Sequence, residues 1–354
     1  MNSLSGISIV STLLSEWYEV HQRDLPWRQN PDPYKVWLSE IILQQTRVDQ
    51  GLPYYEAILK KFPTVRSLAE APLDDLLKYW QGLGYYSRAR NMHTAAKQIV
   101  NEFGGTFPND YATLLHLKGV GEYTASAIAS IVYGEPKAVV DGNVFRVLSR
   151  LFNIDTPINS SEGKRIFSEI AAEILDKENP SRHNQAIMEF GALHCVPVRP
   201  DCSNCPLAAH CLGFAAGQVA TLPVKSKGAA KQERFFFYMV PTDGKHTWLQ
   251  QRLEKDIWQN LWEFPLLESP QALTLEQLLE EPKLKTWFGE AFTIGNPLQF
   301  KHILSHRIIH ATFLPVRIQH AGQVPITWTK ISLNKINTFA VSRMTENFLS
   351  KYTI

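Results

Sequence analysis

The sequence predicts a chain of two different parts, an all-α first part and an α+β second part. Apolar residues recur at helical spacing through most of residues 7–194, whereas from residue 235 onward short apolar and aromatic runs alternate with turn-forming residues. Strands are predicted over 235–240, 246–250, 310–318 and 324–328. Between them, residues 213–231 are rich in Ala, Gly, Lys and Val without a clear period, which is typical of a linker. A chain of 354 residues, 44% of them hydrophobic, is long enough for two ordinary domains.

The charge of the chain excludes few classes of protein. Its formal net charge is only +2, so a nucleic-acid interaction has to be argued from the local placement of residues.

The sequence has no apolar run long enough to cross a membrane, and its N-terminus lacks the basic segment and apolar block of an export signal. We therefore expect a cytoplasmic protein without membrane association.

Helical periodicity is strongest in the first part, where it predicts helices over 7–21, about 33–46, two within 54–80, 91–103, 123–133, 144–152 and two within 160–194.

The helix near residue 40 carries a candidate acid. Glu40 lies next to Ile41 and three residues after Trp37, so its carboxyl group could be partly desolvated. Desolvation raises the pKa of a carboxyl toward the value that a general acid needs. For a lone residue, a solvated helix glutamate is the alternative.

A turn with two glycines precedes the helix predicted over 123–133. Gly119 and Gly121 flank one residue, which indicates a tight turn that can approach another surface closely. The unpaired amides at the start of the following helix suit a DNA phosphate. Asp141 then stands where an N-cap carboxylate is expected, ahead of the helix over 144–152. An ordinary helix-turn-helix with a capping aspartate fits these residues equally well.

Two loops combine aromatic rings with arginines. Residues 23–28 place Trp27 between two arginines, and residues 80–90 place paired tyrosines and two arginines after a glycine-rich turn. Rings and guanidinium groups of this kind can stack on bases and hold phosphates. A packed surface loop is the alternative for each.

All cysteines of the chain fall within seventeen positions, at Cys195, Cys202, Cys205 and Cys211. Such clustering indicates one metal site in place of disulfides. Four thiolates suit either zinc or an iron–sulfur cluster, and ligand chemistry alone leaves both open.

Four segments, WLSEIILQQT, GLGYYSRAR, LKGVGEYTASAI and VVDGNVFRVLSR, resemble in order and spacing the MutY family of adenine DNA glycosylases, of the helix-hairpin-helix/GPD superfamily. The cysteine spacing is that of the [4Fe–4S] loop in this family and in the related endonuclease III family. The resemblance implies an all-α helix-hairpin-helix glycosylase core with an iron–sulfur loop, followed by an α+β MutT-like (Nudix-fold) domain. The implied boundaries are 1–30 and 140–217 for the N-terminal helices with the cluster, 31–139 for a six-helix barrel, 218–232 for a linker and 233–354 for an 8-oxoguanine recognition domain.

The resemblance also implies a reaction. A monofunctional enzyme of this family flips adenine paired with 8-oxoguanine or guanine out of duplex DNA and cleaves its N-glycosidic bond. Glu40 matches the acid that protonates adenine N7, and Asp141 matches the carboxylate that stabilises or traps the sugar cation. Tyr123 and Asn143 match residues that orient this pair. Because the bifunctional relatives carry a lysine where Tyr123 stands, no Schiff base is expected.

The remaining matches concern DNA binding. Gln45 and Tyr85 match the wedge that fills the gap left by the flipped base, Arg88 follows in the same loop, and Gly119 and Gly121 match the backbone-binding hairpin. The residues that match the adenine pocket are Leu25, Trp27, Arg28 and Glu189. In the second domain, residues 301–307 match a Phe-Ser-His loop that touches 8-oxoguanine. Leu304 replaces the phenylalanine, so Ser305, followed by His306, becomes the hydrogen-bonding candidate.

Three alternatives remain at this stage. An endonuclease III-like glycosylase with lyase activity lacks support because the lysine is missing, and a non-catalytic lesion-binding protein would have no need of both Glu40 and Asp141. A nucleotide hydrolase would need the G-x5-E-x7-R-E-x2-E-E run, which is absent from the sequence. We expect a monomer with a [4Fe–4S] cluster, bound to duplex DNA at the nucleoid.

Overall fold

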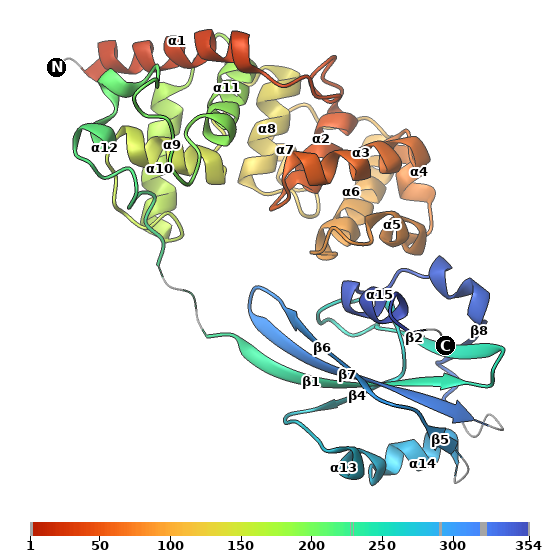
Figure 1. Cartoon of the computed structure of the whole chain (residues 1–354). Coiled ribbons are helices and arrows are strands. Elements are labelled where there is room, and N and C mark those ends of the chain that lie inside the picture. The colour runs from red at the N-terminus through yellow and green to blue at the C-terminus, as the bar shows by residue number, and fades with distance from the viewer. Residues whose placement is uncertain (1–2, 227, 229, 290–291, 319–323, 353–354) are drawn as a thin grey trace. The chain divides into compact units, whose positions relative to one another are not determined.

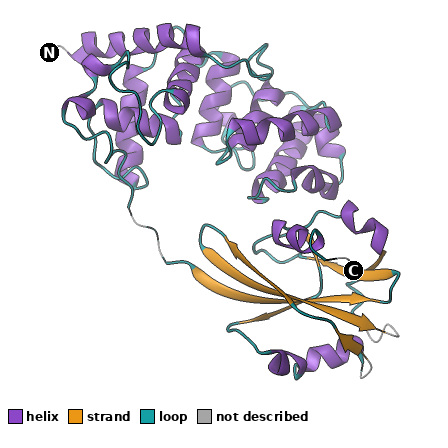
Figure 2. Cartoon of the chain, viewed as in Figure 1, coloured by secondary structure: helices purple, strands orange, loops and turns teal. Residues whose placement is uncertain are grey.

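The structure is a computed structural model that describes residues 3–226, 228, 230–289, 292–318 and 324–352 (Figure 1). The chain forms two compact units, one of residues 1–70 and 91–227 and the other of residues 71–90 and 228–354. Among the described residues, every strand belongs to the second unit (Figure 2). The expected fold class, a helical domain followed by an α+β domain, is therefore confirmed. Lys227 and Ala229 of the predicted linker lie outside the described residues.

The regular elements of the first unit that the structure describes are all helices. Its helices are α1 (Ser3–His21), α2 (Pro33–Leu43), α3 (Val48–Lys61), α4 (Val65–Glu70), α6 (Ser87–Phe103, from Asn91 onward), α7 (Tyr111–Leu114), α8 (Glu122–Tyr133), α9 (Gly142–Leu151), α10 (Ser161–Ile174), α11 (Pro180–Leu193), the 3₁₀ helix η1 (Ala208–His210) and α12 (Leu212–Ala215). Side-chain caps explain several starts, since Asp32 accepts from the amide of Lys35 at α2 and Ser160 accepts from that of Gly163 at α10. In the part of the chain that the structure describes, no helix is both long enough and apolar enough to cross a bilayer.

Helix α11 lies at the centre of the first unit, in contact with α1, α8 and α9. Its side chain Phe190 joins a buried core with Leu14 of α1, Val144 of α9 and Phe167 of α10. Each of these side chains contributes roughly 1.5–3 kcal/mol of burial free energy. The core therefore fixes the ends of α8, α9 and α11, which carry the residues of interest.

The second unit contains α5 (Leu73–Trp80) and an eight-stranded sheet. The other elements are β1 (Gln232–Thr242), β2 (His246–Gln251), β3 (Trp262–Glu263), β4 (Leu266–Ser269), α13 (Leu275–Leu279), α14 (Pro282–Phe288), β5 (Phe292–Ile294), β6 (Leu298–Ile303), β7 (Arg307–Ile318), β8 (Thr329–Ser332), the 3₁₀ helix η2 (Leu333–Thr338) and α15 (Arg343–Leu349). The order is β3-β2-β1-β7-β5, with β4 beside β1, β6 beside β7 and β8 beside β2. The long strands β1 and β7 run parallel, and the other strand pairs are antiparallel.

Alternating apolar residues of β1 bury both faces of this sheet. Phe237 and Met239 pack with Leu284 and Phe288 of α14 on one face. On the other face the Tyr238 ring stacks on Phe313 at 4.8 Å, against which the α15 side chain Phe348 also stacks. Two-sided burial agrees with the nearly continuous apolar run of β1.

Three expectations about elements are wrong. The strand predicted over 324–328 is a turn, in which Trp328 N donates to Pro325 O at 2.9 Å, and the strand β8 begins only at Thr329. Pro325 has no N–H for a ladder, which explains the difference. The region predicted as two helices over 54–80 is interrupted twice and forms α3, α4 and α5. Helix α6 begins at Ser87, so Arg88 lies in its first turn and not in the preceding loop.

Candidate active site and cysteine-lined pocket

Glu40 is carried into the protein interior by the apolar face of α2. Trp37 and Ile42 are fully buried, and Glu40 itself is 9% exposed. Burial raises the pKa of Glu40 to about 7, while a hydrogen bond from Tyr123 opposes the rise. The Tyr123 hydroxyl of α8 donates to Glu40 Oε2 at 2.6 Å. A carboxyl whose pKa is raised toward neutrality can act as a general acid at physiological pH.

Asp141 caps the N-terminus of α9. Its Oδ1 accepts from the amides of Asn143 at 2.9 Å and Val144 at 2.8 Å, and its Oδ2 accepts from Asn143 Nδ2 at 2.9 Å. Burial raises the pKa of Asp141, and these hydrogen bonds lower it. The charge of Asp141 also raises the pKa of Glu40. The site thus holds two carboxyl groups in different environments, one in an apolar surrounding and the other with several donors, which favours an acid and an anion respectively.

Glu189 of α11 binds two arginines of the segment 23–28. Arg23 donates from its backbone N at 2.9 Å, from Nε at 2.8 Å and from Nη2 at 2.6 Å, and Arg28 donates from Nη1 at 3.1 Å and Nη2 at 2.9 Å. Burial alone would raise the pKa of Glu189, but these hydrogen bonds lower it to about 2. Trp27 of the same segment is buried and packs edge-on against Tyr55, with 4.9 Å between ring centroids.

The cluster around Glu189 unites residues that the sequence predicted separately and adds one that it did not. Leu25, Trp27, Arg28 and Glu189 were predicted, and Leu25 is 5% exposed. Arg23 was not singled out, although it makes the shortest contact with Glu189. The sequence shows two arginines in the segment, but their partner is more than 160 positions away, so pattern alone gives no means of pairing them.

A second residue missed by sequence reasoning connects Asp141 with the cysteine segment. Arg146 donates from Nη2 to Asn143 Oδ1 at 2.8 Å and to Gly191 O at 2.6 Å, and from Nε to Cys195 O at 2.7 Å. Arg146 is the fifth residue of α9, and its partners Gly191 and Cys195 are more than 40 positions away, so local pattern gave no signal for these contacts.

The glycine turn between α7 and α8 needs its glycines for different reasons. Gly119 has φ of +77°, and a Cβ there would come within 2.6 Å of Asn91 Cβ. Gly121 is the N-cap of α8 and leaves the first amides of the helix without a side-chain cap. Its Cβ position is open space. The turn is therefore shaped by Gly119 and kept accessible at Gly121.

Gln45 and Tyr85, the two candidate wedge residues, are both exposed and both have positive φ, 57° and 47° respectively. Such backbone conformations are costly for residues with a Cβ and often occur at functional sites. Tyr85 is 49% exposed. Arg88, by contrast, is buried, with its guanidinium over the rings of Trp80 at 5.2 Å and Tyr85 at 5.8 Å.

Ser305 and His306 lie in the tight turn between β6 and β7. The turn is closed by Leu304 N donating to Arg307 O at 2.8 Å, and both central residues are exposed. The Ser305 and Tyr85 hydroxyls, which belong to the same compact unit, are hydrogen-bonded at 2.8 Å. Strand β6 was missed by sequence reasoning, yet the alternation of Leu298, Phe300 and His302 was a usable signal.

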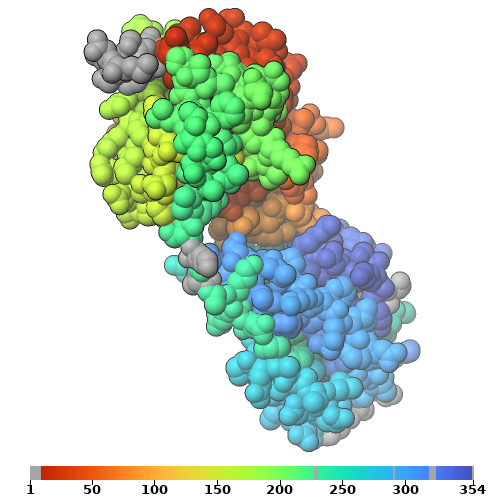
Figure 3. All heavy atoms as spheres, turned by 60° about the vertical axis from the view of Figure 1, so that its left-hand side comes forward, coloured from red at the N-terminus to blue at the C-terminus, as the bar shows by residue number. Residues whose placement is uncertain are grey.

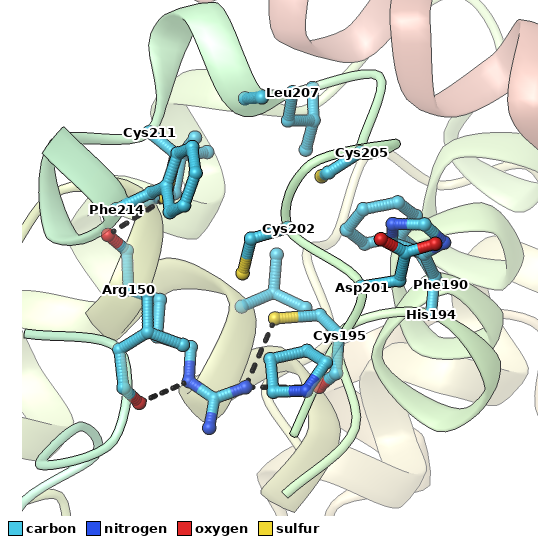
Figure 4. Close-up of a pocket in the computed structure, with 15 residues that line it drawn as sticks. Arg150, Phe190, His194, Cys195, Asp201, Cys202, Cys205, Leu207, Cys211 and Phe214 are labelled. Atoms are coloured by element: carbon cyan, nitrogen blue, oxygen red, sulfur yellow. Dashed lines mark hydrogen bonds between the residues drawn. The ribbon is translucent and has the colours of Figure 1, made fainter. Parts of the chain in front are cut away.

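The four cysteines line one cavity of the first unit. Figure 4 shows Cys195, Cys202, Cys205 and Cys211 around it, with apolar walls that include Phe190 and Leu207. Arg150 donates from Nη1 to Cys195 Sγ at 3.4 Å, and its carbonyl oxygen accepts from Cys211 Sγ at 3.4 Å. In the space-filling view the green segment that carries these cysteines forms part of the surface of the unit, beside the red α1 (Figure 3).

A helical unit with a glycine hairpin, an Asp-capped helix behind it and a buried carboxyl group defines the class of helix-hairpin-helix DNA glycosylases. In agreement, residues 38–173 match the family model of the HhH-GPD superfamily base excision DNA repair proteins. Residues 236–351 match the NUDIX domain.

The chain belongs to the adenine DNA glycosylase (MutY) family and is a DNA N-glycosylase of base excision repair. It is 31% identical to an adenine DNA glycosylase of Buchnera aphidicola subsp. Acyrthosiphon pisum, over 89% of this chain and 88% of that protein. It is 32% identical to the Homo sapiens adenine DNA glycosylase, over 89% of this chain and 67% of that protein.

Solved structures resemble the helical part. A thermostable thymine-DNA glycosylase is 25% identical with a TM-score of 0.56, over 60% of this chain and 98% of its own. Endonuclease III in a non-covalent complex with DNA has a TM-score of 0.53 at 22% identity, over 61% of this chain and 99% of its own, which indicates a shared fold.

Proposed function

We propose that this chain is a monofunctional glycosylase that flips adenine paired with 8-oxoguanine or guanine out of duplex DNA and hydrolyses its N-glycosidic bond. The observation that carries this proposal is the buried Glu40 carboxyl with the Tyr123 hydroxyl 2.6 Å away. We infer further that the enzyme acts as a monomer in the cytoplasm, at the nucleoid, where its DNA substrate lies.

In the proposed mechanism, Glu40 and Asp141 have separate roles. Glu40 in its protonated form gives its proton to N7 of the adenine, which turns the base into a neutral leaving group. As the bond from N9 to the sugar breaks, positive charge develops on the sugar, and the Asp141 carboxylate stabilises it. Water then adds to the sugar carbon and gives a proton to the Glu40 carboxylate, so that the products are free adenine and an abasic site and Glu40 is protonated again. Tyr123 and Asn143 orient the two carboxyl groups.

The absence of an amine at position 123 leads to the first prediction. In a single-turnover incubation with a duplex that carries one adenine opposite 8-oxoguanine, we expect strand cleavage only after treatment with hot alkali. A phenol cannot form a Schiff base with the sugar, so base loss is not followed by elimination. Cleavage without alkali at the rate of base loss would contradict the monofunctional assignment and would favour an endonuclease III-like lyase.

The extruded adenine is proposed to bind near the Glu189 cluster. What supports this site is that the buried apolar side chains Leu25 and Trp27 belong to the same segment as Arg28, whose guanidinium is held by Glu189. Unpairing and unstacking the base costs roughly a few kcal/mol. Gln45 and Tyr85 are the candidates to fill the vacated space, and their exposure agrees with that role.

Recognition of the opposite base is proposed for the turn between β6 and β7. Ser305 and His306 are exposed there, and Ser305 shares a hydrogen bond with the wedge candidate Tyr85. In this arrangement Tyr85 enters the base stack while Ser305 hydrogen-bonds the 8-oxoguanine. The guanidinium group of Arg88 supports Tyr85 through a cation–π contact with its ring.

Gly119 and Gly121 are proposed to bind the DNA backbone.

We propose that Cys195, Cys202, Cys205 and Cys211 hold a [4Fe–4S] cluster. The four side chains surround one cavity with apolar walls, and Arg150 supplies a positive charge next to Cys195. Over the ranges that the structure covers, no three His, Cys, Asp or Glu side chains converge tightly enough for a single metal ion. What favours the cluster over zinc is the C-x6-C-x2-C-x5-C spacing along the chain, which is that of the [4Fe–4S] loop in the MutY and endonuclease III families. When bound, the cluster would cross-link the segment between α11 and α12.

Metal analysis provides the second prediction. We expect the purified protein to be brown and to contain about four iron atoms with matching acid-labile sulfide per chain. Iron and zinc are measured together in the same sample. One zinc atom per chain without sulfide would contradict the cluster and support the alternative that the sequence left open.

A further inference from the structure

A single carboxylate in the second unit binds three arginines, two of them in the strands β1 and β7 and one directly after β2. Asp256, in the loop between β2 and β3, accepts from Arg234 of β1 at 3.0 Å (Nη1 to Oδ1) and 2.8 Å (Nη2 to Oδ2). It also accepts from Nη2 of Arg252, at the end of β2, at 2.9 Å, and from Nη1 of Arg307, the first residue of β7. The side chain of Asp256 is 18% exposed.

This cluster is compact and balanced in charge. Arg234 and Arg252 both lie over the ring of Phe236, at 4.9 and 5.5 Å, and their other partners are Glu268 and Glu263. Burial works against ionisation of Asp256, but the hydrogen bonds from Arg234 and Arg307 hold its pKa well below the usual range. Loss of the Asp256 charge would leave Arg307 without this ion pair.

The cluster lies directly behind the β6–β7 turn. Arg307 closes the turn, since its carbonyl oxygen accepts from Leu304 N at 2.8 Å. The same loop that carries Asp256 touches the other strand of the hairpin, because Trp258 lies 5.8 Å from the His302 ring. The loop that carries Asp256 therefore contacts both strands that flank the exposed turn residues Ser305 and His306.

We propose that Asp256 is a positioning residue for recognition of the base opposite adenine. It acts through Arg307, whose guanidinium it holds, and so fixes the turn in which Ser305 meets the Tyr85 hydroxyl. The inference rests on the proposed function, because it assigns the turn to 8-oxoguanine. Groups displaced by about 1 Å can lose most of their contribution to recognition. Asp256 thereby affects which opposite base is preferred, and leaves the chemistry at Glu40 unchanged.

The test compares cluster-loaded, full-length Asp256→Asn with wild type on two duplexes. One duplex has 8-oxoguanine opposite the adenine and the other has guanine. Dissociation constants are measured with a non-cleavable adenine analogue in each duplex, and single-turnover rates with adenine itself. We expect the preference for 8-oxoguanine over guanine to fall about tenfold in Asp256→Asn, with the rate opposite guanine unchanged. Glu268→Gln is the matched control, because Glu268 also pairs with Arg234 but has no contact with Arg307 in the described residues.

Further variants separate the possible outcomes. Arg307→Gln should reproduce the lost preference if Asp256→Asn fails to fold, and the double variant should lose no more than either single variant. An unchanged preference in folded Asp256→Asn would overturn the inference, as would an equal weakening on both duplexes, which indicates a plain phosphate contact. Ser305→Ala is measured in parallel. If wild type itself shows no preference, the recognition part of the proposed function fails, and Asp256 loses its assignment with it.

Discussion

Replacing Glu40 by glutamine is expected to lower the single-turnover rate of adenine release by about 10³-fold, the range of a lost general acid. Glutamine keeps the size of the side chain and an oxygen to accept the Tyr123 hydrogen bond, but it has no proton to give to the base. Binding of a duplex with a non-cleavable adenine analogue should be unchanged. The rate is measured with adenine opposite 8-oxoguanine, and binding by titration of the labelled duplex.

The matched control is Glu56→Gln, which removes an exposed carboxylate of α3 in the same unit. This variant should release adenine at the wild-type rate. Equal rates for Glu40→Gln and wild type, with both proteins loaded with cluster, would remove Glu40 from the mechanism. Loss of DNA binding together with activity would instead indicate that the substitution disturbs α2.

The pKa of Glu40 makes the reaction pH-dependent. In the proposed mechanism Glu40 acts in its protonated form. Because its pKa is about 7, that mechanism predicts a rate that is level at lower pH and falls about tenfold per pH unit above it. The Tyr123 hydrogen bond lowers this pKa, so Tyr123→Phe should move the falling limb to higher pH. A rate profile of Tyr123→Phe that coincides with that of wild type would contradict this coupling.

The same shift affects stability. The folded protein holds the Glu40 proton more tightly than the unfolded chain, whose value is near 4.5. The contribution of the Glu40 side chain to the free energy of unfolding is therefore greatest below pH 4.5, and it declines as the pH rises to 7. Relative to wild type, Glu40→Gln should gain on the order of 3 kcal/mol in the free energy of unfolding between pH 4 and pH 8. A stabilised but inactive variant is what a functional site under strain predicts.

Local pattern was enough to predict the helical part and the burial of Glu40, because both depend on near neighbours. The apolar residues Trp37 and Ile41 that predicted a desolvated carboxyl are indeed buried, as is Glu40 itself. Caps are also local, and Asp141 caps α9 as its position indicated. The roles of these residues in the reaction stay predictions, since they depend on bound DNA.

Contacts between distant residues were beyond sequence reasoning. The Arg23–Glu189 ion pair joins residues 166 positions apart, and Asp256 lies 51 positions from Arg307. Nothing in the spacing of such residues encodes the pairing, which the packing of helices or strands creates. Strand β6 was missed for another reason, because its alternation is carried by only three residues, Leu298, Phe300 and His302, and residues 301–307 were interpreted as a loop.

Asp141→Asn provides the second large effect, and it separates charge from structure. Asparagine caps helices about as well as aspartate, and it still offers an oxygen to the amides of Asn143 and Val144. Only the negative charge that is proposed to face the sugar cation is lost. We therefore expect the single-turnover rate of adenine release to fall by about 10³-fold, while the thermal midpoint changes little.

DNA binding distinguishes this loss from general damage. Removing an anion from a surface that holds the phosphate backbone should leave the affinity of Asp141→Asn for the analogue duplex equal to or higher than that of wild type. Asp110→Asn, which changes the N-cap of α7 in the same way, is the control and should keep full activity. If Asp141→Asn and Asp110→Asn lose activity to the same degree, Asp141 acts only as a helix cap. If Asp141→Asn alone is inactive and binds tightly, its charge acts on the sugar cation, which a capping role cannot explain.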